Sequence, residues 1–397
     1  MKDQRKFIHF HCFVFLFIIY PFTLSSTEYL TIGGEKHGWE VSVHPDRGTI
    51  KQFRQLMGDV WETIPFRDDS LAGPAWSGMQ LCPSKKQLYV FEAHQGDIYY
   101  TLRYKAAYDH LIVECTISNR GDDVFRPEYS RLFIGVDSEM KTYPDWDTKF
   151  FPTLLRCEKD FAWGYFMSPR QIIMGIGVEE PVASYTLNYV YEGSMEWKWG
   201  HQIKTGSLDL LHCLPLPERH PQNNISLKPH ETRKWTLHLG VVDRLAGVKE
   251  KLSQWIQAPM IECEKYTMAG HETSRLLIHS QSGLEKLIVK APDGTQSVLP
   301  VDGVADNVYS ALFSPSSQKG LYRITATAIN GKTAEAGIYI RNPWSWYMKN
   351  ARDFVARNPP LFSNGCEAFY GYYTAFLGAR HFPETSVDSI LEKRFNR

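Results

Sequence analysis

Residues 98–119 read IYYTLRYKAAYDHLIVECTISN, and apolar and polar side chains alternate through 98–104 and again through 110–117. This alternation, with its β-branched and aromatic residues, is typical of strands that bury one face. Similar runs extend from residue 29 to about residue 240, and turn sequences such as Pro45-Asp-Arg-Gly48 separate them. The segment therefore predicts a large antiparallel β sandwich.

The sequence after this segment predicts one helix and then a second, smaller β unit. Residues 244–256 (RLAGVKEKLSQWI) have a helical period, and Pro259 follows as a stop. The apolar residues predicted to share the buried face of this helix are Leu245, Val248, Leu252, Trp255 and Ile256. Residues 261–339 return to short strands, with a strong hairpin signal at Asn330-Gly331. Strands of this length and spacing predict an immunoglobulin-like sandwich.

The period changes again after Asn342-Pro343. Residues 344–357 and 367–380 predict two helices, and a third begins after Pro383. Aromatic residues lie on every side of these helices, so each helix needs neighbours on every side. Because so few residues follow, we expect the helical part to be the start of a larger assembly that this chain does not complete.

Charge and composition exclude several classes of protein. The chain has 44 Lys and Arg residues against 44 Asp and Glu residues, so its formal net charge is zero. Nucleic-acid-binding proteins need clustered positive charge, so no nucleic acid is expected as a partner. Hydrophobic residues make up 43% of the chain, which is enough for packed cores and unlike a disordered protein.

The first 26 residues have the order of a secretory signal peptide. Basic residues precede an apolar run at 7–22, and the small residues Ser25 and Ser26 follow it. This run is shorter than the roughly 20 apolar residues that span a bilayer. We therefore expect cleavage near Ser26 and export to the periplasm or the extracellular space, with no membrane span in the mature chain; the alternative is a short membrane anchor.

Metal and cofactor sites are not expected. The six cysteines beyond the signal are spread singly, without the spacing of metal ligands, and we expect free buried thiols rather than disulfides. Asp145 and Asp147 lie in an acidic loop, which predicts a solvated surface more than a Ca²⁺ site. The sequence contains no P-loop, dinucleotide fingerprint or nucleophile elbow.

The order of the parts resembles exported polysaccharide-degrading proteins of the six-hairpin glycosidase type. The similar stretches are HLIVECTISN at 110–119, FAWGY at 161–165, SLKPHETR at 226–233, NPWSW at 342–346 and SNGCEAFYGY at 363–372. The resemblance implies a galactose-mutarotase-like β supersandwich at 27–258, an immunoglobulin-like sandwich at 259–341, and at 342–397 the start of an (α/α) barrel.

The resemblance also implies a function. It predicts an exported carbohydrate-active protein, the N-terminal accessory portion of a six-hairpin-type glycoside hydrolase or polysaccharide lyase, with a polysaccharide or oligosaccharide as partner. In such families the catalytic carboxylates come mainly from the barrel, so we expect this chain alone to be catalytically incomplete. The first alternative is a non-catalytic glycan-binding or scaffolding protein. The second is a complete enzyme with its site between the first sandwich and the helices.

Three residues of the second predicted helix are candidates for a sugar site. Glu367 lies in its first turn and is the candidate catalytic carboxylate, with Tyr370 and Tyr373 as substrate-binding partners. The competing interpretation is that Glu367 only stabilises the positive end of the helix dipole.

Two pairs of tryptophans are candidates for stacking against sugar rings. Trp197 and Trp199 alternate onto one face of a predicted strand, and an exposed pair would form a platform for pyranose rings. Burial in the sandwich core is the competing interpretation. For Trp344 and Trp346, we expect packing between the small sandwich and the helices.

Overall fold

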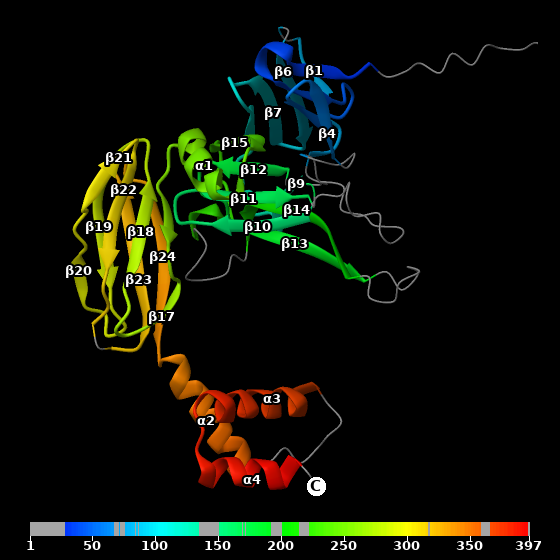
Figure 1. The fold of residues 1–397 in the computed structure, drawn as a ribbon. Helices are drawn as coiled ribbons and strands as arrows, with labels where there is room; N and C mark the ends of the chain where they lie inside the picture. The colour runs from blue at the N-terminus through cyan, green and yellow to red at the C-terminus, as the bar shows by residue number, and fades with distance from the viewer. Residues whose placement is uncertain are drawn as a thin grey trace, which may run out of the picture.

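The computed structural model describes residues 28–395 apart from 67–70, 72–75, 84, 86, 135–150, 169, 171, 192–200, 214–221, 317 and 359–365. Figure 1 shows two β units side by side and three helices beyond the end of the second unit. The predicted fold class is confirmed, because strands dominate the described chain and helices are concentrated at its C-terminal end.

The first β unit contains three sheets, and its strands are antiparallel. The N-terminal sheet has the order β1 (Leu30–Gly34), β2 (Trp39–Val43), β3 (Ile50–Met57), β4 (Val60–Pro65). The eight-stranded sheet has the order β10 (Phe151–Cys157), β11 (Ala162–Met167), β12 (Ile173–Val178), β15 (Thr232–Val242), β8 (Leu111–Asn119), β7 (Ile98–Ala106), β6 (Leu88–Gln95), β5 (Gln80–Leu81). The third sheet has the order β13 (Ser184–Tyr191), β14 (His201–His212), β9 (Tyr129–Ile134).

One apolar core joins these sheets. Phe53 comes from the N-terminal sheet, Leu102 and Trp235 from the eight-stranded sheet and Leu208 from the third sheet, and each is almost fully buried. The burial pattern of β8 alternates strictly between buried and half-buried residues, as the sequence of this strand predicts.

Helix α1 (Val248–Ile256) lies on the eight-stranded sheet, against β12 and β15. Glycines on these strands allow the close approach: a Cβ at Gly177 would lie 2.5 Å from Cγ2 of Ile256. The predicted helix is confirmed, but its start is wrong by one turn. Residues Leu245–Gly247 form a 3₁₀ turn, and Leu245 is 50% exposed instead of lying on the buried face.

The second β unit is a two-layer sandwich. One sheet has the order β16 (Met260–Cys263), β18 (Ser274–His279), β22 (Val308–Phe313), β21 (Gly303–Ala305). The other has the order β17 (Thr267–Ala269), β24 (Thr333–Arg341), β23 (Gly320–Ala328), β19 (Leu284–Lys290), β20 (Gln296–Val298). The predicted Asn330-Gly331 hairpin joins β23 to β24, and Gly331 supplies the positive φ of 86° that the turn requires.

A second apolar core crosses from the first unit into the second. It combines Phe161 and Trp163 of the first unit, Leu252 of α1, and Leu276 and Ile338 of the second unit. The polar contact of Asp160 reinforces this seam, because its Oδ2 accepts from the backbone N–H and the hydroxyl of Thr333, at 2.9 and 2.6 Å. The two sandwiches are therefore packed against each other.

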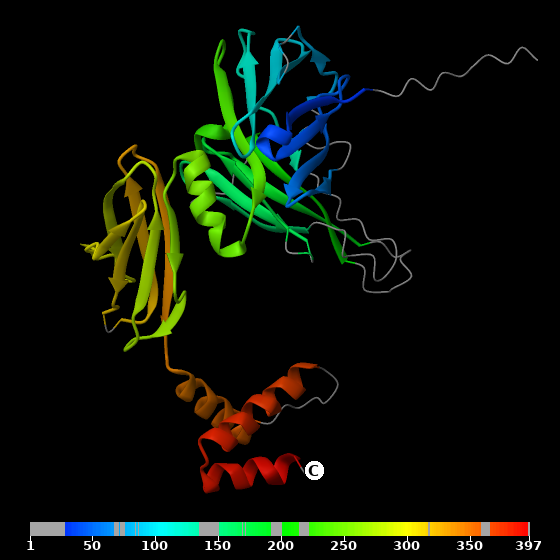
Figure 2. The same cartoon turned by 45° about the horizontal axis from the view of Figure 1, so that its top comes forward.

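Three helices follow: α2 (Trp344–Arg357), α3 (Cys366–His381) and α4 (Thr385–Phe395). Both α3 and α4 pack on α2, and the figures show them well away from the first β unit (Figures 1 and 2). Trp344 and Trp346 are 64% and 46% exposed. The expected packing of these tryptophans is therefore wrong: the helices project from the sandwich, and the guanidinium of Arg341 covers the Trp344 ring at 4.3 Å.

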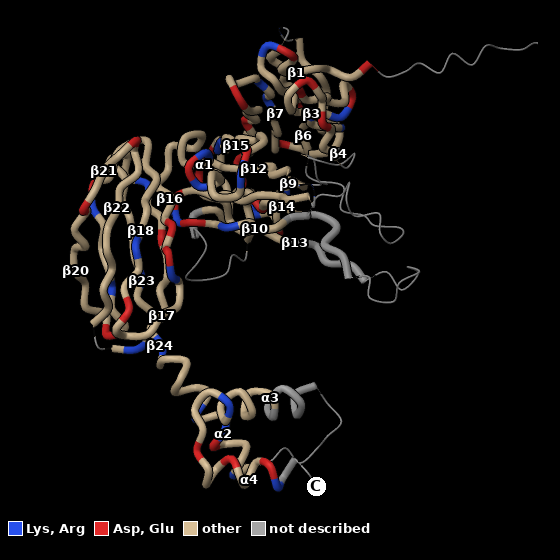
Figure 3. The backbone as a smooth tube through the Cα atoms, viewed as in Figure 1, with Lys and Arg blue, Asp and Glu red and all other residues tan. Residues whose placement is uncertain are grey.

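Two further expectations concern cysteines and charge. The five cysteines whose side chains the structure describes are all free thiols: Cys82, Cys115, Cys157, Cys213 and Cys263. The predicted burial holds for Cys115 and Cys263 and is wrong for the other three, which are half-buried. Basic and acidic residues are interspersed along both β units (Figure 3). Among the described residues, no helix has the length and apolar character to cross a bilayer.

Candidate functional site

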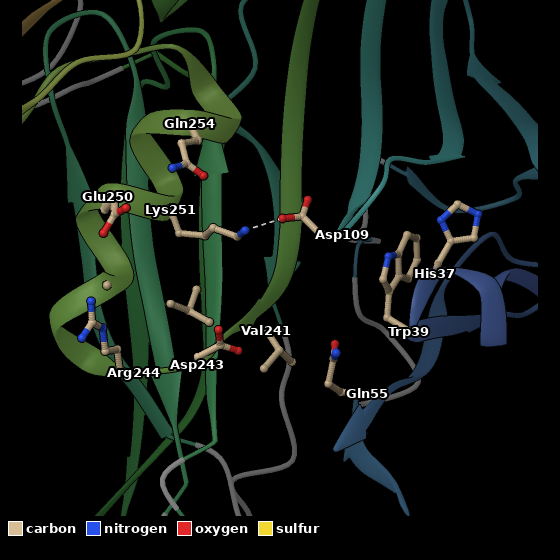
Figure 4. A pocket seen from close by; sticks show the side chains of 12 residues that line it. His37, Trp39, Gln55, Asp109, Val241, Asp243, Arg244, Glu250, Lys251 and Gln254 are labelled. Atoms are coloured by element: carbon tan, nitrogen blue, oxygen red, sulfur yellow. Dashed lines mark ion pairs between the residues drawn. The ribbon is translucent and has the colours of Figure 1, made fainter. Parts of the chain in front are cut away.

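A cavity of about 400 Å³ lies in the first β unit, between the N-terminal sheet and helix α1. Four parts of the chain line it: the start of β2 with the turn before it, β3, the turn before β8, and the segment from the end of β15 into α1. Figure 4 shows their side chains facing one another across the cavity. The site is therefore assembled from residues far apart in sequence.

The helical period of α1 decides which of its residues reach the cavity. Glu250, Lys251 and Gln254 line it, at the three- and four-residue spacing of one helix face. Val248 and Leu252 lie on the other face and are buried against the sheet. The burial of the apolar face thus holds the polar face of α1 toward the cavity.

The opposite side of the cavity is formed by His37, Trp39 and Gln55. The indole N–H of Trp39 donates to the carbonyl oxygen of Tyr108 at 3.3 Å, and its ring stacks on Phe53 with centroids 5.7 Å apart. Trp39 is only 1% exposed. Trp39 therefore holds this wall of the cavity in place. Its ring face is not available for stacking on a sugar.

Charged groups of both signs line the cavity. Lys251 Nζ lies 2.5 Å from Oδ2 of Asp109, and Asp243, Arg244 and Glu250 complete the charged lining. The hydrogen bond from His110 holds the pKa of Asp109 well below its usual value, and Lys251 acts in the same direction against the effect of burial. The lining therefore offers both hydrogen-bond donors and ionised acceptors.

Asp109 is also the first member of a buried hydrogen-bonded series. Its Oδ1 lies 2.7 Å from Nδ1 of His110, His110 Nε2 lies 2.8 Å from Nδ1 of His238, and His238 Nε2 lies 2.7 Å from Oε1 of Glu179. We call these four residues the carboxylate–histidine chain. Trp255 of α1 stacks on the His110 ring, with centroids 4.6 Å apart.

The two ends of the carboxylate–histidine chain are accessible and its middle is buried. The side chains of Asp109 and Glu179 are 33% and 37% exposed, whereas those of His110 and His238 are 10% and 5% exposed. Within the described ranges, no group of three or more His, Cys, Asp or Glu side chains could hold a metal ion.

Of the site residues predicted from the sequence, Tyr373 is the one with a described side chain, and it does not line this cavity. Tyr373 lies on α3 and is 57% exposed. Glu367 and Tyr370 also belong to α3, but their side chains lie outside the described part of the structure. Trp197 and Trp199 lie outside the described residues altogether, as does the acidic loop with Asp145 and Asp147. The roles assigned to these residues stay predictions.

Neither the cavity residues nor the pairing of the two histidines was predicted from the sequence. A signal for the α1 residues was present, because an amphipathic helix at 244–256 that buries its apolar face turns its polar face toward solvent or a cavity. No comparable signal pairs His110 with His238, which are 128 residues apart.

The fold is similar to a solved polysaccharide lyase. The match has a TM-score of 0.63 at 14% sequence identity and covers 89% of this chain and 58% of that chain. This chain thus spans less than two thirds of the length of the lyase.

Two mutarotase-related structures are also similar, at lower scores. A galactose mutarotase related enzyme from Lactobacillus acidophilus matches with a TM-score of 0.32 at 6% identity, over 54% of this chain and 98% of its own. A galactose mutarotase-like protein from Lactobacillus casei matches with a TM-score of 0.32 at 9% identity, over 54% of this chain and all of its own (100%).

No protein-family model matches the sequence, and neither does any curated protein. The fold class expected from the sequence is nevertheless confirmed, because 89% of this mainly β chain shares its fold with part of a polysaccharide lyase.

Proposed function

We propose that this chain is an exported carbohydrate-active protein, and that its first β unit binds a polysaccharide or oligosaccharide in the cavity beside α1. The observation that carries the proposal is the shared fold with a polysaccharide lyase over 89% of the chain. The proposal divides the chain into a signal peptide at 1–26, a mutarotase-like sandwich at 27–258, an immunoglobulin-like sandwich at 259–341 and a helical part at 342–397.

The chemistry of the cavity supports a sugar ligand. Sugar hydroxyls both donate and accept hydrogen bonds, and the cavity offers both partners: the carboxylates of Asp243 and Glu250, the guanidinium of Arg244 and the amide of Gln254. A volume of about 400 Å³ falls within the usual range of small-molecule sites, roughly 300–1,000 Å³.

We propose binding, and not cleavage, for this chain by itself. Cleavage of a glycosidic bond by hydrolysis needs two carboxyl groups about 5 to 10 Å apart on either side of the bond. The only catalytic carboxylate proposed from the sequence is Glu367, on α3. The role proposed for the chain is therefore that of the N-terminal, accessory part of a polysaccharide hydrolase or lyase.

Affinity electrophoresis tests this function. The purified chain is run through gels that each contain one polysaccharide, and products are assayed in parallel. A lyase leaves an unsaturated, ultraviolet-absorbing sugar end, whereas a hydrolase leaves only a new reducing end. We expect retardation by at least one polysaccharide and no product of either kind. Unretarded migration in every gel would contradict the proposal.

A non-catalytic scaffolding or glycan-binding protein is the second candidate. The observation that favours it is the exposure of Trp344 and Trp346 at the start of α2, although Arg341 covers one face of the Trp344 ring. If this surface binds the glycan, substitution of both tryptophans by alanine will abolish retardation, while variants of the cavity will be retarded like the wild type.

A complete enzyme with its site between the first sandwich and the helices is the third candidate from the sequence, but α2, α3 and α4 lie well away from the first β unit (Figure 1). It nevertheless makes a separate prediction. Such an enzyme would release product, and Glu367→Gln would abolish the release. Product formation that survives this substitution would exclude Glu367 as the catalytic carboxylate.

A further inference from the structure

The carboxylate–histidine chain places two buried histidines between two carboxylates, a feature that the proposed sugar site does not itself require. Each ring nitrogen of His110 and His238 has one hydrogen-bond partner, and the three contacts measure 2.7, 2.8 and 2.7 Å. These are distances of well-formed hydrogen bonds, so each contact needs one proton between its two heavy atoms.

The number of protons that these contacts need determines the charge of the carboxylate–histidine chain. An ionised carboxylate only accepts, so His110 must donate from Nδ1 to Asp109 and His238 must donate from Nε2 to Glu179. The contact between the two rings needs a third proton. Two neutral imidazoles carry only two ring protons between them. With both carboxylates ionised, the pair of rings must therefore hold one additional proton and one positive charge.

The additional charge belongs to one of the two rings, and the groups around them decide which. His110 is packed against Trp255 and faces Lys251 on α1 as well as Asp109. Burial lowers the pKa of His110 and Asp109 opposes this effect, but the charge of Asp109 is already shared with Lys251, whose Nζ lies 2.5 Å from its Oδ2. His110 is thus the neutral ring: its Nδ1 donates to Asp109, and its Nε2 accepts from His238.

The carboxylate partner of His238, Glu179, is acted on by the charge of Lys332 from the second β unit. Glu179 contacts His238 directly, and the other charges near this carboxylate are those of Glu180 and Lys234. Burial raises the pKa of Glu179, but the hydrogen bond and charge of His238 outweigh that effect and leave the pKa below its usual value. An ionised Glu179 can then balance a positive charge on His238.

We propose that His238 is an imidazolium held between neutral His110 and ionised Glu179, and that its N–H to Nε2 of His110 selects the His110 tautomer that donates to Asp109, the partner of Lys251 at the cavity. Asp109 uses Oδ1 for His110 and Oδ2 for Lys251, so a rotation of its carboxylate would release both. Asp109, His110 and His238 are then positioning residues for Lys251. This last consequence rests on the proposed function, whereas the charge of His238 does not.

The charge state can be measured on the free protein by NMR. Long-range ¹H–¹⁵N correlation distinguishes protonated from unprotonated ring nitrogens. At neutral pH we expect both nitrogens of His238 to be protonated and His110 to be protonated at Nδ1 only. The exposed His271 serves as an internal reference for a ring in water. One unprotonated nitrogen on each buried ring would overturn the proposal, whatever the protein binds.

A pair of adjacent substitutions tests the cause of the charge. Glu179→Gln removes the balancing carboxylate, and we expect one nitrogen of His238 to become unprotonated at the same pH. Glu180→Gln is the matched control: Glu180 bonds to the backbone N–H of Thr236 at 2.6 Å, so His238 should keep both protons. An imidazolium that persists in Glu179→Gln, or one lost equally in both variants, would contradict the assigned role of Glu179.

The consequence for the cavity has its own measurement. If the carboxylate–histidine chain positions Lys251, His238→Gln should weaken sugar binding by an otherwise wild-type protein. Added to Lys251→Met, the same substitution should cause no further loss of affinity. Additive losses of sugar affinity would show that His238 does not act through Lys251. The charge state of His238 in the wild type would still be decided by NMR. Absence of sugar binding by the wild type would contradict the proposed function and leave the ring protonation unaffected.

Discussion

At the scale of residues, the carboxylate–histidine chain links the acid stability of the protein to its cavity. Folding lowers the pKa of His110 through burial, that of Asp109 through its bond with His110, and that of Glu179 through the bond with His238 that outweighs its burial. Each group therefore binds protons more readily in the unfolded chain. Their contribution to stability is present above the unfolded pKa values and is lost as the pH falls through the folded ones.

We therefore predict that the free energy of unfolding falls as the pH drops below about 6.5, the ordinary pKa of histidine, and falls further through the carboxyl range. Denaturant unfolding over a pH series measures this dependence. Asp109→Asn should flatten the acid limb, whereas Asp59→Asn, at an exposed position, should leave it unchanged. An identical pH dependence in wild type and Asp109→Asn would contradict the account.

The local sequence predicts the strands that carry both histidines but not their contact. Residues 110–117 and 235–239 have clear strand patterns, and the structure forms β8 and β15 there. That the two strands are neighbours depends on the order of the eight-stranded sheet, in which β15 lies between β8 and β12. Sheet order is set by packing between distant segments, so neither pattern alone contains it.

At the scale of elements, helix α1 is held by close packing on a glycine-lined part of the sheet. A Cβ at Gly177 would lie 2.5 Å from Cγ2 of Ile256, which is fully buried and cannot move aside. We predict that Gly177→Ala destabilises the protein by about 1–3 kcal/mol, the usual cost of overpacking. Gly270→Ala is the control, because its nearest neighbour would lie 3.8 Å away. Equal unfolding midpoints for the two variants would contradict this packing argument.

The three helices depend on one buried cation. Arg352 of α2 is 1% exposed, and it pairs with Asp353 at 2.8 Å and with Glu384 before α4 at 2.7 Å. Its guanidinium also donates to the carbonyl oxygen of Phe382. These contacts hold the segment between α3 and α4 against α2.

We predict that Arg352→Met loosens the helices and leaves the sandwiches folded. The loss should be about 2 kcal/mol, below the 3–5 kcal/mol of a fully buried pair because Glu384 is 53% exposed. Hydrogen exchange over residues 366–395 measures it, with the exposed Arg357→Met as control. Unchanged protection in Arg352→Met would show that Arg352 does not hold the helices.

For the helices, the local sequence predicts the bounds but not the neighbours of individual side chains. The bounds 344–357 were predicted and α2 has them, because the aromatic and charged residues there follow a helical period. The packing predicted for Trp344 and Trp346 is wrong, because burial of an aromatic residue depends on which neighbours reach it. In this structure Arg341 covers one face of Trp344, and both tryptophans remain exposed.

At the scale of the whole molecule, the two sandwiches share a core and should unfold together. Phe161 and Trp163 of the first unit belong to the same apolar cluster as Leu276 of the second. The carboxylate of Asp160 adds two hydrogen bonds to Thr333 across the seam. Replacing it leaves the amide of Thr333 without that partner, at a cost of about 1–3 kcal/mol.

We predict one cooperative thermal transition for both sandwiches, lowered in temperature by Asp160→Ala. Scanning calorimetry measures it, and Asp122→Ala, whose side chain is 99% exposed, should unfold like the wild type. Two separate β transitions in the wild type would contradict a shared core.

The central claim is that the cavity beside α1 binds a sugar. The most direct test is a calorimetric titration with an oligosaccharide prepared from the polysaccharide that retards the protein most. It is titrated into the wild type, into the double variant Arg244→Ala with Asp243→Asn, and into the exposed control Arg357→Ala. The account predicts saturable binding by the wild type and the control, and at least a tenfold weaker affinity in the cavity variant, which is about 1.4 kcal/mol. Equal affinity in all three proteins would place the sugar elsewhere and contradict the claim.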